Sequence, residues 1–463
     1  MGDVRHPLDE RLAAVLPPGS LYAVGGRVRD EFRAQAEGRA FEPKDLDYVV
    51  VGLALPDLLA RLSTVGRTDV VGAAFAVVKV TSPDGAADIA LPRRERSTGV
   101  GHVDFEIESG PHVTLAEDLG RRDFRMNMIA RRIDDDAIVD PHGGVEDIAR
   151  RRIDIRTPQT FHEDPLRMLR AAGFAARFGF RLSPAATSAM TAAASLVRTV
   201  SAERIGEELT KLFARAPVPS VGVEMLRETG LLAEVWPEVL EGVAVDQNEW
   251  HAYDVYRHNL VTLDATPPGD VVLRLAALLH DVGKPRTKDG PHFYRHEHVG
   301  ADLVVAMLER YRFSNDTIGT VQHLVRAHMY AADPEMQAKT IRRFVNRIGA
   351  EHLDRLFALR AADVIGSGLP KRSDENERFQ ARVATILAES PPMTVRDLAI
   401  GGTDIIGLMI GAGVAPVGFA GDQRVGQTLA ALFEEVVDDP LRNVRDLLAA
   451  RAERYISEHF ERT

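Results

Sequence analysis

The stretch Lys44-Asp-Leu-Asp-Tyr-Val-Val-Val-Gly52 sets two carboxylates, Asp45 and Asp47, at the start of an apolar run that is typical of a buried strand. Because side chains alternate along a strand, both carboxylates are predicted to lie on one face. Two neighbouring carboxylates repel each other unless a divalent cation lies between them. This stretch therefore predicts a β-strand that presents a Mg²⁺-binding pair.

A second motif, Leu21-Tyr-Ala-Val-Gly-Gly-Arg-Val-Arg-Asp30, lies upstream of this pair. An apolar run leads into Gly25-Gly26, and an amphipathic segment that carries Arg29 begins at Arg27, so the motif predicts a strand, a tight turn and a helix. Such a turn lets backbone N–H groups approach a phosphate closely at the helix N-terminus. A phosphate-binding turn beside a Mg²⁺-binding pair is suited to chemistry on a nucleoside triphosphate.

The composition describes a globular protein of several domains. With 463 residues the chain exceeds one ordinary hydrophobic core, so two to four domains are expected. No apolar run approaches the roughly 20 residues of a membrane span, and the N-terminus lacks the apolar segment of a secretory signal. The absence of cysteine excludes disulfides and thiolate metal sites. Together these features favour a cytoplasmic protein without membrane contact.

The net charge of −11 argues against a protein that coats nucleic acid without regard to sequence. RNA can still bind, because a local patch sets the field near a bound phosphate. Residues 121–156 supply a basic patch, formed by Arg121, Arg122, Arg125, Arg131, Arg132, Arg150, Arg151, Arg152 and Arg156. For the later arginines the alternative is an ordinary solvated basic surface.

Hydrophobic periodicity divides the chain into an α/β part and a helical part. β-rich runs alternate with helical patterns in residues 20–155, which predicts a short mixed sheet. The runs are Tyr48–Val51, Phe75–Val80, Ala87–Leu91 and Ala137–Asp140. After residue 160, apolar spacings of three and four predict helices. These are Asp164–Phe178, Ala202–Ala214, Val223–Thr229, Asp270–Leu279 and Gly300–Tyr311. We expect four sections, 1–158, 159–245, 246–385 and 386–463, with Ser390-Pro-Pro-Met393 as the last linker.

The two N-terminal motifs resemble those of a known family. Gly25-Gly26-x-Val28-Arg29-Asp30 followed by Asp45-x-Asp47 is similar to the bacterial (class II) tRNA nucleotidyltransferase and poly(A) polymerase family, within the DNA polymerase beta-like superfamily. The resemblance implies an α+β fold. It would begin with a nucleotidyltransferase palm that contains a mixed sheet, followed by an all-helical neck and body, an HD region and a tail.

A third carboxylate would complete a two-metal site. Asp88, in Ala87-Asp-Ile-Ala-Leu-Pro-Arg93, begins the next credible strand, and the alternative is a strand-end aspartate that contacts solvent. The resembled family has an acidic residue at the start of this strand. With Asp45 and Asp47 it would hold Mg²⁺, where one ion lowers the pKa of the attacking hydroxyl and the other neutralises the leaving pyrophosphate.

Two further motifs resemble the nucleotide-binding parts of this family. The run Arg121-Arg-Asp-Phe-Arg-Met-Asn-Met128 is similar to Arg-Arg-Asp-Phe-Thr-Ile-Asn-Ala, although Arg125-Met126 departs from that pattern. The resemblance implies that Arg122 contacts the triphosphate, for which a guanidinium is well suited. It also implies that Asp123 and Asn127 hold sugar and backbone.

The motif Glu163-Asp-Pro-Leu-Arg-Met-Leu-Arg170 begins a helix with an acidic cap and an early proline. Asp164 and Arg167 are three residues apart and share one helical face, so an ordinary salt bridge between them is the alternative to a binding role. In the resembled family this pair reads the Watson–Crick edge of CTP or ATP, and Arg170 matches a further nucleotide contact. Ser201–Glu208 resembles the next, supporting motif, and Arg93–His102 resembles the loop that switches C to A addition.

A different set of residues follows between residues 246 and 365. Leu278-Leu-His-Asp-Val-Gly-Lys284 places His280 beside Asp281, a donor pair typical of Ni²⁺, Mn²⁺, Fe²⁺ or Zn²⁺ sites. This stretch looks like an HD-domain metal phosphohydrolase. The matched ligand set is His258, His280, Asp281, His296, His328 and Asp363. His298 and His323 are the alternatives to His296 and His328.

The resemblance implies an enzyme that transfers CMP, CMP and AMP from CTP and ATP to the 3′ end of tRNA, with no DNA partner. The HD site would use metal-activated water on cyclic phosphates, 2′-nucleotides or terminal phosphates. Two alternatives stay within the same chemistry, namely addition of A alone and poly(A) synthesis. A third is an HD phosphohydrolase whose N-terminal domain binds RNA without catalysis.

Overall fold

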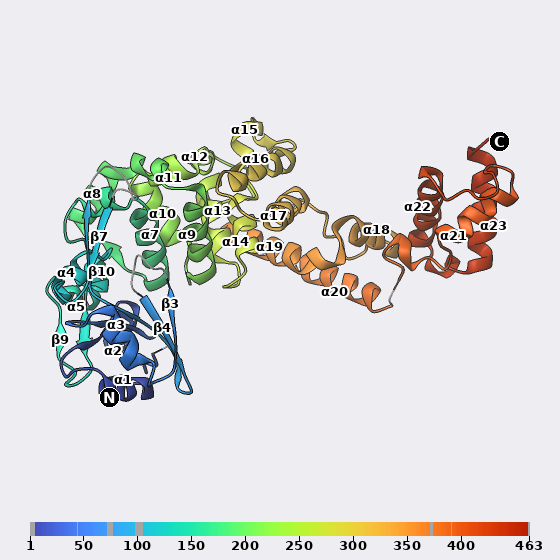
Figure 1. Cartoon of the computed structure of the whole chain (residues 1–463). Helices are drawn as coiled ribbons and strands as arrows, with labels where there is room; N and C mark the ends of the chain where they lie inside the picture. Colours follow the sequence, from blue (N-terminus) through green and yellow to red (C-terminus); the bar gives the residue numbers. More distant parts are fainter. Residues whose placement is uncertain are drawn as a thin grey trace. The chain divides into compact units, whose positions relative to one another are not determined.

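The computed structural model describes residues 5–43, 45–71, 77–97, 105–370, 374–389 and 391–461 (Figure 1). The chain divides into two compact units. Unit 1 comprises Met1–Glu241, Pro267–Val271 and Met307–Phe313, and unit 2 comprises Gly242–Thr266, Val272–Ala306 and Ser314–Thr463. The finer division into four sections stays a prediction.

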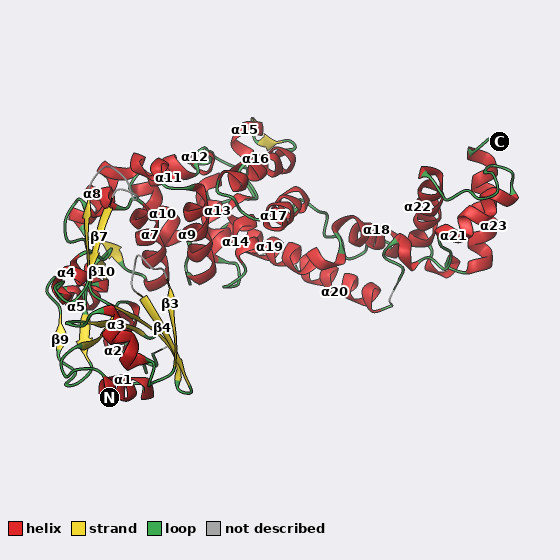
Figure 2. Cartoon of the chain, viewed as in Figure 1, coloured by secondary structure: helices red, strands yellow, loops and turns green. Residues whose placement is uncertain are grey.

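A seven-stranded mixed sheet forms the centre of the N-terminal part of unit 1 (Figure 2). Its strands, in spatial order, are β3 (Arg67–Val71), β4 (Val77–Ser82), β5 (Gly85–Ala90), β2 (Asp47–Val50), β1 (Leu21–Val24), β8 (Ala130–Arg132) and β9 (Ile138–Val139). Strands β2 and β5 are parallel, and their neighbours pair antiparallel. Both central strands are apolar and almost wholly buried. The sheet and the helical remainder confirm the expected α+β fold.

Helices cover this sheet and form the rest of unit 1. Those before residue 160 are α1 (Pro7–Val15), α2 (Gly26–Ala36), α3 (Leu55–Leu62), α4 (Leu115–Gly120) and α5 (Gly144–Ala149). Those after it are α6 (Thr160–Glu163), α7 (Leu166–Phe178), α8 (Pro184–Ala193), α9 (Ala202–Arg215), α10 (Ser220–Glu228), α11 (Leu231–Val235) and α12 (Pro237–Leu240). Two small pairs of strands complete the unit, β6 (Arg93–Ser97) with β7 (Phe105–Ser109) and β10 (Arg152–Ile153) with β11 (Arg181–Leu182).

The following helices carry the second set of site residues. They are α13 (Val255–Asp264), α14 (Val271–Leu279), α15 (Lys284–Thr287), α16 (His296–Arg310), α17 (Asn315–Ala327), α18 (Ala338–Ile348), α19 (Leu353–Gly366) and α20 (Glu375–Ala388). A hairpin of β12 (Lys288–Asp289) and β13 (His292–Phe293) lies between α15 and α16. Helix α14 is almost entirely apolar and buried over Leu273–Leu279, which fixes the turn that follows it. Helix α16 begins at His296, four residues before the expected start, so His296 belongs to the helix.

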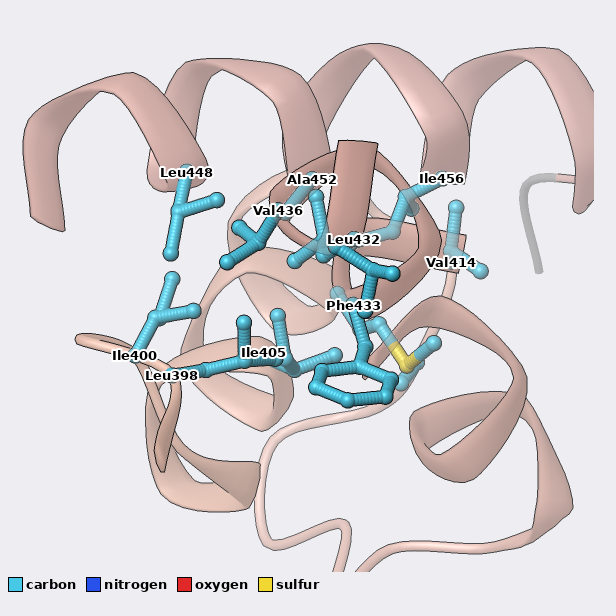
Figure 3. Close-up of a cluster of buried hydrophobic side chains, with 13 residues drawn as sticks. Leu398, Ile400, Ile405, Val414, Leu432, Phe433, Val436, Leu448, Ala452 and Ile456 are labelled. Carbon is cyan, nitrogen blue, oxygen red and sulfur yellow. The ribbon is translucent and has the colours of Figure 1, made fainter. Parts of the chain in front are cut away.

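The C-terminal helices α21 (Gly402–Gly411), α22 (Gln423–Asp438) and α23 (Arg445–His459) enclose their own hydrophobic cluster (Figure 3). Its members include Ile405, Leu432, Val436, Ala452 and Ile456, none of which is accessible beyond 1%. The guanidinium of Arg342 on α18 donates to the carbonyl oxygens of Val437 and Asp438 at 2.6 Å each. These carbonyls end α22, where orphan acceptors and the helix dipole favour a cation.

Among the described residues, no helix combines the length and the apolar character that crossing a membrane requires.

Candidate active sites

The central sheet brings the three predicted aspartates to one place. Asp47 pairs with Asp88 in the parallel register of β2 and β5. Strand β2 begins at Asp47, so Asp45 lies in the bend before it and not on the strand, which corrects the expected placement. The backbone N–H of Asp88 donates to Leu46 O at 2.9 Å, which ties the residue between the two aspartates to β5.

The electrostatics of this group favour a cation. Burial and the negative charges of Asp88 and Asp45 raise the pKa of Asp47, although Arg122 opposes the shift. The side chains of Asp45 and Asp88 are exposed and accessible to ions. The three carboxylates do not form one of the tight groups, with ligand atoms all within 4.8 Å, that occur among the described residues. They fit a site for hard divalent cations that leaves ligand positions for water and phosphate oxygens.

The glycine turn lies against an arginine. Gly25 has φ +67°, a conformation that other residues rarely adopt, and a Cβ there would lie 2.9 Å from Nη1 of Arg122. Helix α2 begins at Gly26, so its free N–H groups point out of the turn. A glycine is therefore needed at position 25 for Arg122 to approach the helix N-terminus.

Asp118 orients the two arginines and was not identified from the sequence. Its side chain is fully buried and accepts from Arg121 at 2.8 Å and from Arg122 at 3.1 Å. Burial raises its pKa, but the two guanidinium groups outweigh burial and hold the pKa below its usual value. The spacing of three and four residues along one helical turn was the available signal.

A chain of hydrogen bonds links the remaining motif residues. The guanidinium of Arg170 donates to Asp123 Oδ2 at 2.7 and 2.9 Å, and Asn127 Nδ2 donates to Asp123 Oδ1 at 2.7 Å. Arg29 Nη1 in turn donates to Asn127 Oδ1 at 2.9 Å. Residues from α2, α7 and the segment between them therefore orient one another without bound nucleotide.

Asp164 and Arg167 do not form the i,i+3 salt bridge that was the alternative to a binding role. Asp164 pairs instead with Arg204 on α9 at 3.0 Å. Arg167 donates to Glu163 and to the carbonyl oxygen of Arg121, both at 2.8 Å. The base-reading pair is thus held from two sides by Arg204 and Glu163.

These motifs line one cleft of about 630 Å³ within unit 1. Its described lining contains ten cationic and five acidic side chains, so it is locally basic although the whole chain is acidic. The cationic members are Arg29, Arg93, Arg121, Arg122, Arg167, Arg170, Arg177, Arg204, Lys211 and Arg215. Part of the predicted switching loop, residues 98–102, lies outside the described residues.

Arg125, which departs from the family pattern, has a structural role. Its guanidinium lies 3.0 Å from the buried Asp147 and 3.2 Å from Asp154. The following residue, Met126, is fully buried. The Arg125-Met126 pair therefore packs well, with two carboxylates that compensate the charge.

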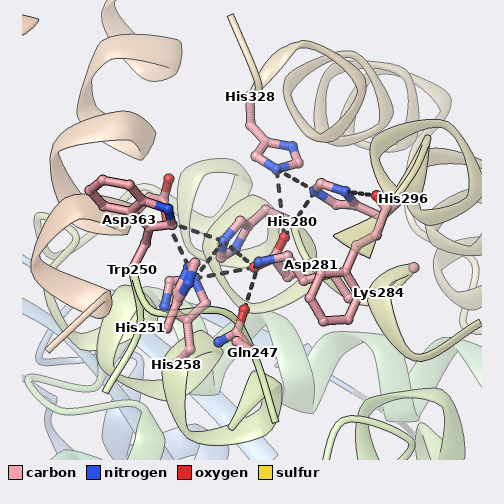
Figure 4. A network of polar contacts seen from close by, with 12 residues as sticks. Gln247, Trp250, His251, His258, His280, Asp281, Lys284, His296, His328 and Asp363 are labelled. Carbon is pink, nitrogen blue, oxygen red and sulfur yellow. Dashed lines mark hydrogen bonds and ion pairs between the residues drawn. The ribbon is translucent and has the colours of Figure 1, made fainter. Parts of the chain in front are cut away.

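The second set of site residues gathers in unit 2 (Figure 4). The helices place His258 on α13, His280 and Asp281 directly after α14, His296 at the start of α16, His328 at the end of α17 and Asp363 on α19. All except Asp363 are at most 5% accessible. The structure does not bring His298 or His323 into this cluster, because His298 contacts Glu297 and His323 contacts Ile348 O.

The imidazole Nε2 atoms face the two carboxylates. His258 Nε2 lies 3.2 Å from Asp363 and 3.3 Å from Asp281. His296 Nε2 also lies 3.3 Å from Asp281. Lys284 Nζ contacts Asp281 at 2.6 Å and the side-chain oxygen of Gln247, which the sequence did not point to, at 2.7 Å.

The hydrogen bonds of the rings fit a metal centre. The Nδ1 atoms of His280, His296 and His328 lie 2.9, 2.8 and 2.6 Å from backbone carbonyl oxygens. Because a carbonyl only accepts, each Nδ1 carries the proton and each Nε2 offers a lone pair to the cluster.

The carboxylates of the cluster also fit a bound cation. Asp281 Oδ1 is buried and accepts no hydrogen bond among the described residues. Burial opposes a charge on His280, yet Asp281 and Asp363 outweigh it and raise the pKa of His280 to about 10. The donor set therefore attracts positive charge and suits a divalent transition metal.

Family models match both regions. The model of the poly A polymerase head domain matches residues 21–154, and that of the probable RNA and SrmB-binding site of polymerase A matches residues 179–242. The HD domain model matches residues 262–365. The fold and these matches define a nucleotidyltransferase that carries an HD domain.

Known proteins narrow this class. The multifunctional CCA protein of Nitrosococcus oceani is 37% identical over 340 residues, which cover 71% of this chain and 80% of that protein. That of Azoarcus sp. is 34% identical over 382 residues, which cover 79% and 89%. The fold also matches a Bacillus stearothermophilus CCA-adding enzyme in complex with CTP, with a TM-score of 0.66, 24% identity and coverage of 97% and 96%. The chain belongs to the family of the multifunctional CCA proteins.

Proposed function

We propose that this chain adds C, C and A from CTP and ATP to the 3′ end of tRNA without a nucleic-acid template. The observation that carries the proposal is the pairing of Asp47 with Asp88 beside the Gly25 turn and Arg122. The names of the relatives support it, as do solved enzymes of this fold in complex with CTP and with a tRNA that ends in CCA. A cytoplasmic location fits a tRNA substrate.

The residues of the cleft suit separate parts of this reaction. Asp45, Asp47 and Asp88 would hold Mg²⁺, which supplies an activated 3′-hydroxyl and a neutralised pyrophosphate when bound. The free N–H groups after Gly25 and the guanidinium of Arg122 suit the triphosphate oxygens. The oriented Asp164 and Arg167 offer an acceptor and donors, which is what the edges of cytosine and adenine require in place of a template.

Labelled CTP and ATP, each alone and then together, with a tRNA that lacks CCA, test this proposal. Incorporation of CMP followed by AMP is expected. Addition of a single AMP without CMP would indicate an A-adding enzyme, and a long A tail would indicate a poly(A) polymerase. Asp47→Asn should abolish incorporation, whereas Asp69→Asn, an exposed aspartate on β3 of the same sheet, should not.

We also propose a phosphohydrolase activity for the HD site, with Ni²⁺, Mn²⁺, Fe²⁺ or Zn²⁺. The buried cluster around Asp281 supports it, since such donors hold a metal that lowers the pKa of water for attack on a phosphoester. Cyclic 2′,3′-phosphates, 2′-nucleotides and terminal phosphates are the substrates to assay. His280→Ala should abolish hydrolysis and keep incorporation, while Asp47→Asn does the reverse. If Asp47→Asn leaves both activities intact, the N-terminal domain only binds RNA.

A further inference from the structure

The carboxylate of Asp281 lies between two separate groups of metal donors, as Figure 4 shows. Its Oδ2 atom is 3.3 Å from Nε2 of both His258 and His280. Its Oδ1 atom is 3.3 Å from Nε2 of His296 and 3.6 Å from Nε2 of His328. Each oxygen of one carboxylate thus faces its own pair of histidines.

Donor spacing gives the same division. Ligand atoms of His258, His280 and Asp363 all lie within 4.8 Å of one another, and so do those of Asp281, His296 and His328. Opposite ligands of a single ion are only about 4.2 Å apart, twice a metal–nitrogen bond of roughly 2.1 Å. One shell of six donors would therefore form a single tight group, whereas these six form two.

Charge and hydrogen bonding agree with two cations. Asp281 Oδ1 is buried without a hydrogen-bond partner among the described residues, while Oδ2 contacts the ammonium of Lys284 at 2.6 Å. The Nε2 atoms of His258 and His280 are 3.0 Å apart, and those of His296 and His328 are 3.3 Å apart. Lone pairs at such distances repel unless a proton or a metal ion lies between them.

We propose that the HD site binds two divalent transition-metal ions bridged by Asp281. One ion takes His258, His280 and Asp363, and the other takes His296 and His328. This inference rests on the proposed HD metal site and adds a second ion to it. Two ions held about 3.5–4 Å apart clamp the attacking and leaving oxygens of a phosphoester, so the substrate is a phosphoester rather than an uncharged ester.

Metal counting with Mn²⁺ tests the proposal in the full-length chain. Asp45→Ala with Asp47→Ala removes the carboxylates of the nucleotidyltransferase site, so the ions that remain belong to unit 2. Calorimetry and elemental analysis should then give two Mn²⁺ per chain, with the exchange-coupled electron paramagnetic resonance signal of a bridged pair. Adding His296→Gln and His328→Gln should leave one ion and an uncoupled signal.

His298→Gln is the matched control, because it lies on the same helix and is half exposed outside the cluster. It should leave both the count and the coupling unchanged. A single ion that persists in the His296→Gln, His328→Gln variant would overturn the second ion but leave the HD metal site. Two uncoupled ions would overturn the Asp281 bridge. A chain that binds no ion would overturn the HD metal site itself, independently of CCA addition.

Discussion

A buried ion pair beneath the nucleotidyltransferase site offers a stringent test of the structure. Arg27 on α2 and Asp9 on α1 have side chains only 2% and 1% accessible, and their atoms lie 2.5 and 2.8 Å apart. The hydroxyl of Tyr48 contacts both groups, and Tyr48 directly follows Asp47 on β2. The pair therefore joins two helices to the strand that carries a proposed metal ligand.

Asp9→Leu leaves the Arg27 guanidinium buried without a counter-charge. Removing one partner of a buried pair costs about 3–5 kcal/mol, whereas replacing both partners by apolar residues is often close to neutral. Arg27→Met should have a cost of similar size, and the double variant should cost much less than the sum. Exchange of amide hydrogens in the affected elements should accelerate roughly 10²–10⁴-fold in each single variant.

The cost of Asp9→Leu should also depend on pH. Burial acts to raise the pKa of Asp9, but the hydrogen bond and charge of Arg27 outweigh burial and lower it. The carboxylate therefore stabilises the fold above its unfolded pKa of about 3.9, and this contribution is lost as the pH falls through the lowered folded value. The difference in stability between variant and wild type should be full at pH 7 and shrink below roughly pH 4.

Hydrogen exchange followed by mass spectrometry measures these effects locally, which matters because two compact units need not unfold together. Peptides that cover 7–15, 21–36 and 47–50 report the perturbation, and peptides from 423–438 serve as the internal control. Strictly additive costs of the two single variants would refute the coupling between the charges. Equal acceleration in the control peptides would show a global effect instead.

Three further predictions concern packing. Gly206→Ala should destabilise unit 1 by about 1–3 kcal/mol, because its Cβ would lie 2.2 Å from the carbonyl oxygen of Tyr311; Gly319→Ala, with nothing within 4 Å of its Cβ, should instead stabilise α17 by about 0.5–1 kcal/mol. Urea unfolding followed by circular dichroism measures both. Phe433→Ala should cost about 3–5 kcal/mol, measured by hydrogen exchange in α21–α23, whereas the 85% accessible Leu441 should tolerate alanine. Arg342→Met should cost about 1–3 kcal/mol and accelerate exchange at the end of α22, because it leaves carbonyl oxygens without their donors.

Periodicity was sufficient to predict the main elements of the fold. Helices α7, α9 and α14 lie within two residues of their expected limits, because each has an apolar stripe that must be buried. Strand starts were less exact. Asp45 and Asp47 were expected on one strand, but the hydrogen-bonded ladder begins only at Asp47. An alternating pattern does not show where pairing with the neighbouring strand starts.

The partners of the site residues could not be predicted in the same way. Arg204 holds Asp164 from another helix, 40 positions later in the chain, and nothing in the local pattern of either segment points to the contact. The pair of Asp9 and Arg27 is similar, since charged residues at these positions usually indicate exposed helical faces. Asp118 was predictable, because its spacing from Arg121 and Arg122 is that of one helical turn.

These partners also explain how an acidic chain can bind a polyanionic substrate. The guanidinium groups of Arg122 and Arg170 are held by the buried carboxylates of Asp118 and Asp123, respectively, before any nucleotide binds. Because each carboxylate engages only part of a guanidinium fork, donors remain for phosphate oxygens. The net charge of −11 disfavours unspecific attraction of RNA at long range. Affinity must therefore come from oriented, short-range hydrogen bonds within the cleft, which selects a substrate that fits them over nucleic acid in general.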